Sequence, residues 1–279
     1  MTLDESYAYC VRVSRKRARN FYYSFVLLSA PQRKAICAMY AFMRYCDDLS
    51  DDVSIANRAD AIGRWKADLD GALAGRFSGH PVWPAFHDAV MRYKIPHQYF
   101  YDMIAGVSSD LEPRRIRTFD ELYRYCYQVA SVVGLTIIHI FGFESPQALE
   151  LAEKCGIAFQ ITNILRDVRE DAENNRVYLP AEDLQRFSIT AQDVANGEDS
   201  SRFRQLMAFE AARAESYYAA SMPLIRLVHR QSQGSLWALI QIYRRLLARI
   251  MASNYAVLSQ RIRVPTWEKL LIVVRGFAR

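Results

Sequence analysis

The sequence predicts an all-α protein, built as a single domain of long helices. Gly (11) and Pro (9) are scarce among the 279 residues, which favours long helices over a turn-rich β architecture. Apolar residues make up 51% of the chain and recur with a helical period, whereas no alternating run of strand length occurs. No composition shift or low-complexity linker divides the chain, so we assign residues 1–279 to one domain.

Local capping signals place several of these helices. Ser29-Ala-Pro31-Gln32 has the pattern of an N-cap with Pro near the helix start. Thr118-Phe-Asp-Glu121 is a capping box, and Ser145-Pro146 combines a capping Ser with Pro at the first helical position. The helices we expect cover about 31–52, 55–74, 81–94, 96–109, 118–142, 146–173, 201–230 (kinked at Pro223) and 235–261, with a short last helix from Pro265-Thr266.

Charge and cysteine content narrow the classes of function. The formal net charge of +6 suits anionic partners such as phosphorylated substrates, acidic lipids or nucleic acid. A nucleic-acid site would show a basic face interleaved with aromatic residues, whereas here acids and bases intermingle, so we predict no nucleic-acid partner. The five cysteines have no metal-ligand spacing, which predicts reduced thiols in a cytoplasmic protein.

We expect neither a signal peptide nor a transmembrane segment. The N-terminus, Met-Thr-Leu-Asp-Glu-Ser, lacks the apolar region of a signal peptide. The longest apolar stretch, Val129 to Phe143, is interrupted by polar residues and is shorter than the ~20 residues that a spanning helix needs.

Two aspartate pairs carry most of the functional information. Asp47 and Asp51 lie four residues apart at the end of one apolar run, and Asp167 and Asp171 repeat this spacing at the end of another. On a helix, each pair lies on one face, where like charges repel unless a cation lies between them. A hard divalent cation such as Mg²⁺ prefers these oxygen ligands. A solvated helix end is the alternative for one pair, but the second copy favours a metal site.

Each aspartate pair extends a polar stripe along its helix. The two stripes are Tyr40, Arg44, Asp47 and Asp51, and Gln160, Asn163, Asp167 and Asp171. A polar stripe within an apolar helix is costly to bury without partners. We therefore predict that the stripes face each other across a cavity with carboxylates at its rim. This prediction selects Asp47 and Asp51 over the equally spaced Asp48 and Asp52.

Arginines and a small-residue segment complete the pattern. The guanidinium fork suits phosphate oxygens, although any single Arg is also explained as a surface charge. The segment from Tyr125 to Leu135 is apolar with small residues, which indicates either close helix packing or the wall of an apolar tunnel. The candidate arginines near the motifs are Arg17, Arg19, Arg44, Arg166 and Arg176.

At these residues the chain resembles the squalene/phytoene synthase family. The matching segments, spread over about 15–265, are Arg19–Phe25, Tyr40–Asp51, Tyr125–Gly134, Gln160–Asp171 and Arg176–Pro180. The resemblance implies the isoprenoid synthase fold, a bundle of long helices around a central cavity. It also implies head-to-head coupling of two allylic prenyl diphosphates with Mg²⁺ as cofactor, as two to three ions.

The resemblance also implies roles for individual residues. The metal ligands would be Asp47, Asp51, Asn163, Asp167 and Asp171. The residues at the reacting atoms would be Tyr40, Arg44, Tyr243 and Tyr125, the last matching a tyrosine proposed to steer proton loss. The residues that hold the diphosphates and prenyl chains would be Arg17, Arg19, Phe21, Val129, Val133, Gln160, Arg166, Arg176 and Tyr178.

The segment around Ser131 leads us to predict a product. Ser131 replaces the Gly usual in the family's Val-Ala-Gly motif, and the residues after it are more like bacterial presqualene diphosphate synthases. We therefore predict that two farnesyl diphosphates form presqualene diphosphate, in the squalene and hopanoid pathway, for handover to a squalene-forming reductase. The alternatives are phytoene from two geranylgeranyl diphosphates, squalene made with NADPH, and a non-enzymatic helical module that binds acidic lipids. Greasy substrates and positive charge also predict peripheral contact with the inner face of the membrane.

Overall fold

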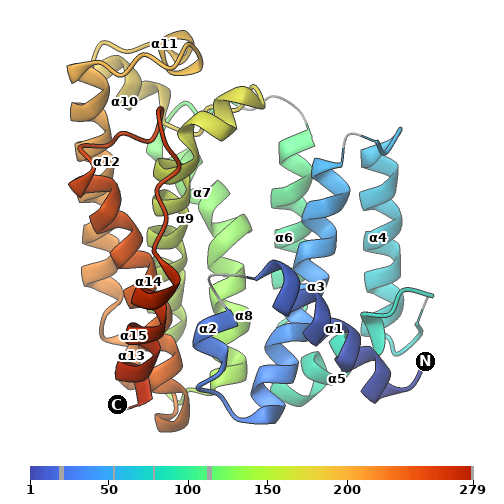
Figure 1. The fold of residues 1–279 in the computed structure, drawn as a ribbon. Helices are drawn as coiled ribbons and strands as arrows, with labels where there is room; N and C mark the ends of the chain where they lie inside the picture. The colour runs from blue at the N-terminus through green and yellow to red at the C-terminus, as the bar shows by residue number, and fades with distance from the viewer. Residues whose placement is uncertain (19–21, 53, 78, 112–114, 278–279) are drawn as a thin grey trace.

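The computed structural model describes residues 1–18, 22–52, 54–77, 79–111 and 115–277, and it confirms the predicted all-α architecture (Figure 1). Within those ranges, the only extended pairings are two isolated bridges, Arg115 with Val177 and Phe143 with Val228. The five cysteines are all buried and form no disulfide.

The helices follow the chain in this order: α1 (Leu3–Arg17), α2 (Tyr22–Phe25), α3 (Ala30–Asp51), α4 (Arg58–Leu73), α5 (Trp83–Tyr93), α6 (Gln98–Ser108), the 3₁₀ turn η1 (Ser109–Leu111), α7 (Phe119–Cys126), the π turn η2 (Tyr127–Ser131), α8 (Val132–Phe141), α9 (Gln147–Glu173), α10 (Ala181–Arg186), α11 (Ala191–Ala195), α12 (Ser201–Ser221), α13 (Leu224–Leu227), α14 (Arg230–Ala252) and α15 (Thr266–Phe277).

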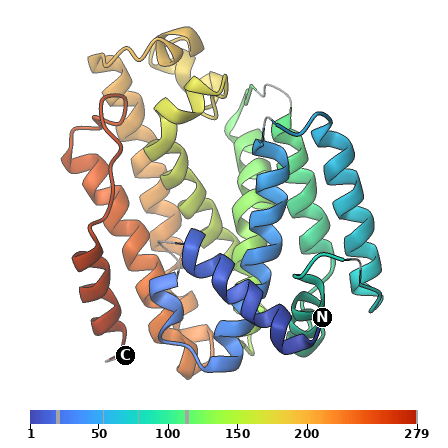
Figure 2. The same ribbon diagram turned by 45° about the vertical axis from the view of Figure 1, so that its right-hand side comes forward.

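The long helices form two groups with a third between them (Figures 1 and 2). Helices α3 to α6 make one side of the bundle, and α9, α12, α14 and α15 make the other. The continuous segment α7–η2–α8 lies between these groups and packs on both α6 and α9. Helix α1 crosses α3 and α5 on the outside.

An aromatic cluster fixes α3 against its neighbours. The Phe42 ring lies 4.6–5.9 Å, between centroids, from the rings of Trp65, Trp83, Phe86 and Phe100 on α4, α5 and α6. Aromatic pairs at this separation stabilise a core beyond the area they bury. Because this face of α3 is occupied by the core, its opposite face is left to line a cavity.

Most predicted helices are present, but three predictions about them need correction. The helix expected over 118–142 is present without a break as α7, η2 and α8, but its middle is a π turn. The helix expected over 201–230 breaks before Pro223, whose ring cannot continue it, and a separate short helix α13 follows. The last long helix begins at Arg230 and ends at Ala252, well before the expected 261, because Asn254 and Tyr255 adopt positive φ.

The structure confirms some of the predicted helix caps and not others. Thr118 accepts a hydrogen bond from the Glu121 N–H as expected, but the Glu121 side chain accepts from the Arg117 N–H, so the predicted capping box is only half formed. Ser29 makes no capping bond and instead donates to the Gln32 side chain at 2.9 Å. Helix α1 was not predicted, although Thr2 and Glu5 form a complete capping box at its start. Its buried face includes the small or polar Ser6, Cys10 and Ser14, which gives little apolar periodicity to detect.

Candidate active site

The two acidic helix ends lie at the same end of the bundle. Helices α3 and α9 both carry their aspartate pairs in their last turns, and both ends point the same way (Figure 1). The segment after α9 bridges them, because Arg176 lies 3.5 Å from the Asp51 carboxylate. The predicted juxtaposition of the two acidic clusters therefore occurs in the fold.

A cavity of about 260 Å³ separates α3 from α9. Each helix lines it with residues at the same spacing, three or four positions apart, so each presents one continuous face. These residues are Ile36, Met39, Tyr40, Met43, Arg44 and Asp47 on α3, and Ala152, Cys155, Gly156, Phe159, Gln160 and Asn163 on α9. Along both helices the lining changes from apolar to polar toward the acidic end, as the predicted stripes required.

The π turn forms another wall of this cavity. Val129, Ala130, Val133 and Gly134 all line it, as expected for the wall of a tunnel. A π turn adds a residue to a helical turn and re-aims the side chains around it. The packing interpretation also holds, because a Cβ on Gly156 would lie 2.4 Å from the Ser131 Cα. One segment thus lines the cavity and packs closely against α9.

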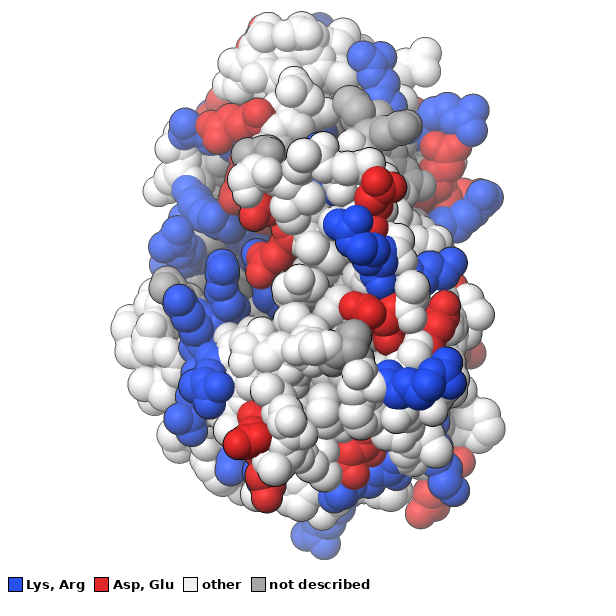
Figure 3. All heavy atoms as spheres, turned by 90° about the vertical axis from the view of Figure 1, so that its right-hand side faces the viewer, with Lys and Arg blue, Asp and Glu red and all other residues white. Residues whose placement is uncertain are grey.

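A second, larger cavity of about 940 Å³ shares Tyr40, Arg44, Asn163 and Tyr243 with the first. Its described lining contains no carboxylate and is strongly basic. The cations are Arg15, Arg17, Arg44, Arg166, Arg261, Arg263 and Lys269. Figure 3 shows Lys and Arg side chains gathered along one edge of the molecule, at the left of the view. An anionic group would be attracted to this basic cavity.

The two carboxylates of the first aspartate pair have different electrostatic environments. Asp47 lines the first cavity, and burial raises its pKa to about 7. Asp51 is exposed and lies 3.5 Å from Arg176. The neighbouring Asp48 pairs with Arg44 instead of a ligand. Asp52 accepts hydrogen bonds from the Ser54 N–H and hydroxyl, so it is held in the loop after α3.

In the second pair the order is reversed, with the ion-paired carboxylate first and the one with the raised pKa second. Asp167, the first of the two, pairs with Arg166 and lies 3.4 Å from Arg261. Burial and the negative charge of Asp167 raise the pKa of Asp171 to about 7. Within the described part of the chain, neither Asp47 nor Asp171 has an ion-pair partner, whereas Asp51 and Asp167 both do.

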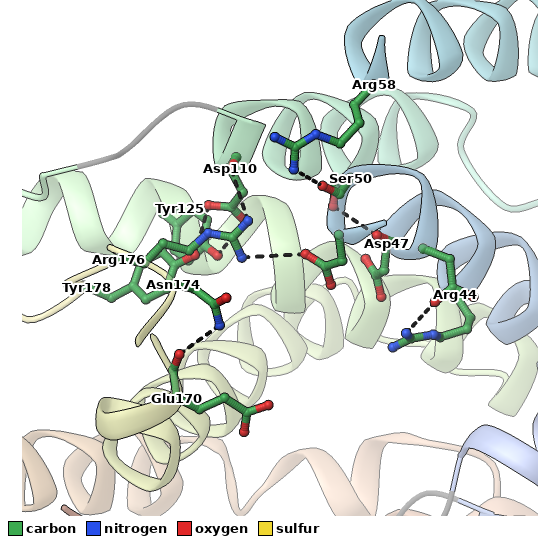
Figure 4. Close-up of polar contacts among 12 residues, drawn as sticks. Arg44, Asp47, Ser50, Arg58, Asp110, Tyr125, Glu170, Asn174, Arg176 and Tyr178 are labelled. Carbon is green, nitrogen blue, oxygen red and sulfur yellow. Dashed lines mark hydrogen bonds and ion pairs between the residues drawn. The ribbon is translucent and has the colours of Figure 1, made fainter. Parts of the chain in front are cut away.

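Asp110, in η1, organises the tyrosines and one arginine beside the acidic ends (Figure 4). Tyr125 and Tyr178 donate their hydroxyl protons to its two carboxylate oxygens at 2.9 and 3.0 Å, with their rings stacked 4.9 Å apart. Arg176 donates to the Asp110 carbonyl oxygen at 3.1 Å. Sequence reasoning missed Asp110 because its partners lie 15 to 68 positions away, beyond any local spacing.

Comparison with known proteins agrees with this geometry. The family model for squalene/phytoene synthase matches residues 14–268. The chain belongs to the squalene/phytoene synthase family. It is 36% identical to the phytoene synthase of Arthrospira platensis, over 97% of this chain and 92% of the relative. It is also 36% identical to the 15-cis-phytoene synthase of a Synechocystis strain, over 100% of this chain and 86% of the relative.

Solved structures of the squalene/phytoene synthase family share the fold. A dehydrosqualene synthase crystallised with a ligand superposes with a TM-score of 0.91 and 27% identity, over 99% of this chain and 96% of that chain. The squalene synthase HpnC of Alicyclobacillus acidocaldarius superposes with a TM-score of 0.85 and 25% identity, over 91% and 95% of the two chains. The predicted isoprenoid synthase fold is therefore confirmed.

The residues predicted from the family resemblance divide by location. Those that line one or both cavities are Arg17, Tyr40, Arg44, Asp47, Val129, Val133, Gln160, Asn163, Arg166 and Tyr243. Those placed beside the acidic helix ends are Asp51, Tyr125, Asp167, Asp171, Arg176 and Tyr178. Arg19 and Phe21 lie outside the described residues. Arg15, Asp110, Arg261, Arg263 and Lys269 were not predicted.

Two buried atoms at the cavity mouth fit a metal-bound diphosphate. In the described structure, the Asn163 Oδ1 and the Arg44 Nε are buried without a hydrogen-bond partner. An orphaned oxygen calls for a donor or a cation, and an orphaned N–H calls for an acceptor. No group of three or more His, Cys, Asp or Glu side chains in the described ranges could hold a metal by itself. A divalent cation here would therefore need additional oxygens, such as those of a phosphate.

The tyrosines at the cavity mouth stay protonated at neutral pH, so their hydroxyl groups can donate hydrogen bonds. Burial raises the pKa of both Tyr40 and Tyr243 to about 12. Burial also raises the pKa of Tyr125 well above its usual value, and its proton is already donated to Asp110. The Tyr243 ring stacks on Phe159 with centroids 4.2 Å apart, which fixes it over the apolar interior.

Proposed function

We propose that this protein is a phytoene synthase, which joins two geranylgeranyl diphosphates head to head with the help of Mg²⁺. The observation that carries the proposal is the cavity between α3 and α9, apolar inside and acidic at its mouth, with a basic cavity adjoining it. An elongated apolar chain ending in a diphosphate matches this gradient in polarity. The choice of a C20 substrate follows the names of the 36% identical relatives.

The farnesyl-based reaction is the second candidate. In the sequence, Ser131 and the residues after it led us to predict presqualene diphosphate as the product. Two solved relatives are a dehydrosqualene synthase and a squalene synthase. Those relatives are only 25–27% identical, whereas the phytoene synthases are 36% identical over nearly the whole chain. Ser131 is moreover buried, packs against Gly156 and donates to the Glu153 carbonyl oxygen at 2.8 Å. Its side chain therefore serves helix packing, which weakens it as an indicator of the product.

In the proposed mechanism, the polar end of the cavity binds and orients the leaving diphosphate. The ligands proposed for Mg²⁺ are Asp47, Asp51, Asn163, Asp167 and Asp171. When bound, the metal would neutralise charge that develops on the diphosphate. Arg44 and Arg166, which are paired with carboxylates in this structure, would turn to the diphosphate oxygens.

The apolar end of the cavity would position the two prenyl chains for coupling. The C1–O bond of one substrate breaks, and the diphosphate leaves with the electron pair. The 2,3 double bond of the second substrate attacks the allylic cation, and loss of a proton closes a cyclopropane. Loss of the second diphosphate and of a second proton would yield the C40 hydrocarbon. Phe159, Val129 and their apolar neighbours would exclude water, which would otherwise capture the cation.

The released diphosphate is the proton acceptor that we propose. Tyr40 and Tyr243 line the cavity, but a pKa of about 12 keeps their hydroxyl groups protonated at neutral pH. The Tyr125 hydroxyl already donates to Asp110. Tyr125 would then position Tyr178 and Arg176 through this shared partner rather than accept the proton.

Product mass tests the proposed function. The purified protein is incubated with Mg²⁺ and either farnesyl or geranylgeranyl diphosphate, with and without NADPH. We expect a C40 hydrocarbon from geranylgeranyl diphosphate, without a need for NADPH. A C30 diphosphate from farnesyl diphosphate alone would overturn the substrate assignment, and squalene formed only with NADPH would identify the third alternative.

Two aspartate variants separate an enzyme from a lipid-binding module. Asp47→Ala should abolish product formation and Asp167→Ala should lower it strongly, whereas Asp4→Asn, a change at a highly exposed carboxylate on α1, should leave it unchanged. Absence of product from the unmodified protein with either substrate would contradict enzymatic function.

A further inference from the structure

Helix α15 exposes a continuous apolar face to solvent. Five large side chains on it are between 49% and 68% exposed: Trp267, Leu270, Leu271, Val274 and Phe277. At about 100° per residue, these five fall within one arc of the helix. Figures 1 and 2 show α15 on the outside of the bundle, packed on one side only. Singly exposed apolar residues are ordinary, but a contiguous patch of this kind indicates an interaction surface.

Helix α15 differs from an ordinary surface helix in that two charged residues lie on its buried face. Its buried face carries Glu268 and Lys269, which are only 7% and 8% exposed. Glu268 accepts hydrogen bonds from Arg245 at 2.5 Å and from Arg249 at 2.7 Å. The bundle thus buries Val273, supplies partners for Glu268 and leaves five large apolar residues of α15 outside. This arrangement costs solvation energy unless the outward face has an apolar partner.

The charge around this face is positive. Residues 261–277 contain the cations Arg261, Arg263, Lys269 and Arg275 and a single acid, Glu268, which is buried and paired. Arg275 borders the apolar arc, and Arg245 and Arg249 lie beside it through their contacts with Glu268. The surface is therefore complementary to one that is apolar inside and anionic at its rim.

The exposed face continues into the basic cavity. Thr266 and Lys269 line that cavity, while Trp267 and Leu270, their immediate neighbours in sequence, face outward. The apolar face of α15 therefore adjoins the basic cavity.

We propose that α15 lies in the surface of an anionic lipid bilayer, with its apolar arc among the acyl chains and its flanking arginines at the headgroups. No helix among the described residues is long and apolar enough to cross a membrane, so the helix would lie in the interface plane. The mouth of the basic cavity then opens at the bilayer, where amphiphilic prenyl diphosphates and a hydrocarbon product partition.

Vesicle binding tests this surface without any prenyl diphosphate, so the result is independent of the proposed reaction. The protein is mixed at low salt with vesicles of phosphatidylcholine containing 30% phosphatidylglycerol, or of phosphatidylcholine alone, and bound protein is measured by flotation. We expect binding to the anionic vesicles, weakened by salt and by removal of the anionic lipid. The double variant Leu270→Glu with Val274→Glu should lower the partition coefficient at least ~10-fold.

A matched double variant controls for the added charge. Phe77→Glu with Met91→Glu also changes two exposed apolar residues, on the α4–α5 side of the bundle away from α15 (Figure 1). It should bind vesicles nearly as the unmodified protein does. Both variants should keep their activity on detergent-dispersed substrate, which shows that they fold.

Three outcomes would overturn the membrane surface. The first is that the unmodified protein binds neither type of vesicle. The second is that both double variants lose vesicle binding to the same extent. The third is a dimer of the unmodified protein that Leu270→Glu with Val274→Glu converts to a monomer, because this would assign the face of α15 to a second copy of the chain.

Discussion

The two aspartate pairs have the same spacing in sequence but opposite electrostatic arrangements in the fold. In the first pair the inner carboxylate, Asp47, has a raised pKa, and the outer one, Asp51, is paired with Arg176. In the second pair the inner carboxylate, Asp167, is paired with Arg166 and Arg261, and the outer one, Asp171, has the raised pKa. Each pair thus combines one carboxylate that is ion-paired with arginine and one that forms no ion pair in the described structure. The charge of Arg44 opposes the raised pKa of Asp47, and the charges of Arg176 and Arg166 oppose that of Asp171, but in both cases burial outweighs them.

This difference indicates a division of labour within each pair. A half-buried carboxylate that forms no ion pair and has a raised pKa costs folding free energy, and a ligand that supplies positive charge would offset that cost. The ion-paired carboxylates, Asp51 and Asp167, would in addition hold arginines close to the cavity mouth, where those arginines can exchange a carboxylate for a diphosphate. The predictions below test this division.

The largest effects are expected at the two carboxylates with a raised pKa. Asp47→Asn and Asp171→Asn should each lower kcat/KM by roughly 1000-fold, equivalent to about 4 kcal/mol of transition-state stabilisation, because each removes a metal ligand that nothing replaces. Steady-state kinetics with varied Mg²⁺ measures this loss. Near-normal activity in either variant would remove that residue from the metal site.

Smaller effects are expected at the two ion-paired carboxylates. Asp51→Asn and Asp167→Asn should lower kcat/KM by about 10- to 100-fold, because the released arginines can still bind the diphosphate. The same kinetic measurements rank the four variants. Equal losses at all four positions would contradict the proposed division of labour, although not the metal site itself.

Asp110 should affect Asp51 and not Asp167. Asp110→Asn weakens the hydrogen bonds that Tyr125 and Tyr178 donate to the Asp110 carboxylate. Because Arg176 donates to the carbonyl oxygen of the same residue, we expect Arg176 to shift and its contact with Asp51 to loosen. We expect about a 10-fold loss of kcat/KM, mostly in kcat. In double-mutant cycles the loss should be non-additive with Asp51→Asn and additive with Asp167→Asn. Equal coupling to both would show that Asp110 supports the fold generally.

The smallest expected effect is on stability without metal. Asp47→Asn should raise the free energy of unfolding by roughly 1–2 kcal/mol at pH 8, less than the full pKa shift implies because solvent screens a half-buried group. A raised folded-state pKa means that the folded protein binds more protons than the unfolded chain between pH 3.8 and about 7. The wild-type protein therefore loses stability over that window as pH rises.

The gain from Asp47→Asn should accordingly be absent near pH 3 and complete above pH 7, as measured by urea denaturation in EDTA. Asp4→Asn, at a highly exposed carboxylate, is the matched control and should show no such gain. A loss of stability in Asp47→Asn at pH 8 would indicate that Asp47 has a compensating partner.

The sequence predicted the features that depend on local spacing. The stripes on α3 and α9 follow from helical period alone, and their carboxylates indicated the metal-binding end. Contacts between distant segments were beyond such reasoning. The basic cavity joins Arg15 and Arg17 of α1 to Arg261 and Arg263, and Asp110 meets Tyr178 across 68 positions.

Local reasoning was also less secure where a side chain serves packing between helices. Ser131 was taken as an indicator of the product, but its side chain bonds to the α9 backbone beside Gly156. The sequence of α15 has the same helical periodicity as an ordinary amphipathic helix. Only the placement of Glu268 and Lys269 against the bundle reveals which face is outside.

The most direct test of the two-pair account is the Mg²⁺ dependence of binding to a geranylgeranyl diphosphate analogue whose C1–O bond is replaced by a non-ionising linkage. Titration calorimetry should show binding with Mg²⁺, its loss in EDTA, and its loss with Mg²⁺ in both Asp47→Asn and Asp171→Asn but not in Asp4→Asn. Equally tight binding by the unmodified protein in EDTA and in Mg²⁺ would contradict the claim that two facing aspartate pairs hold the diphosphate through a divalent cation.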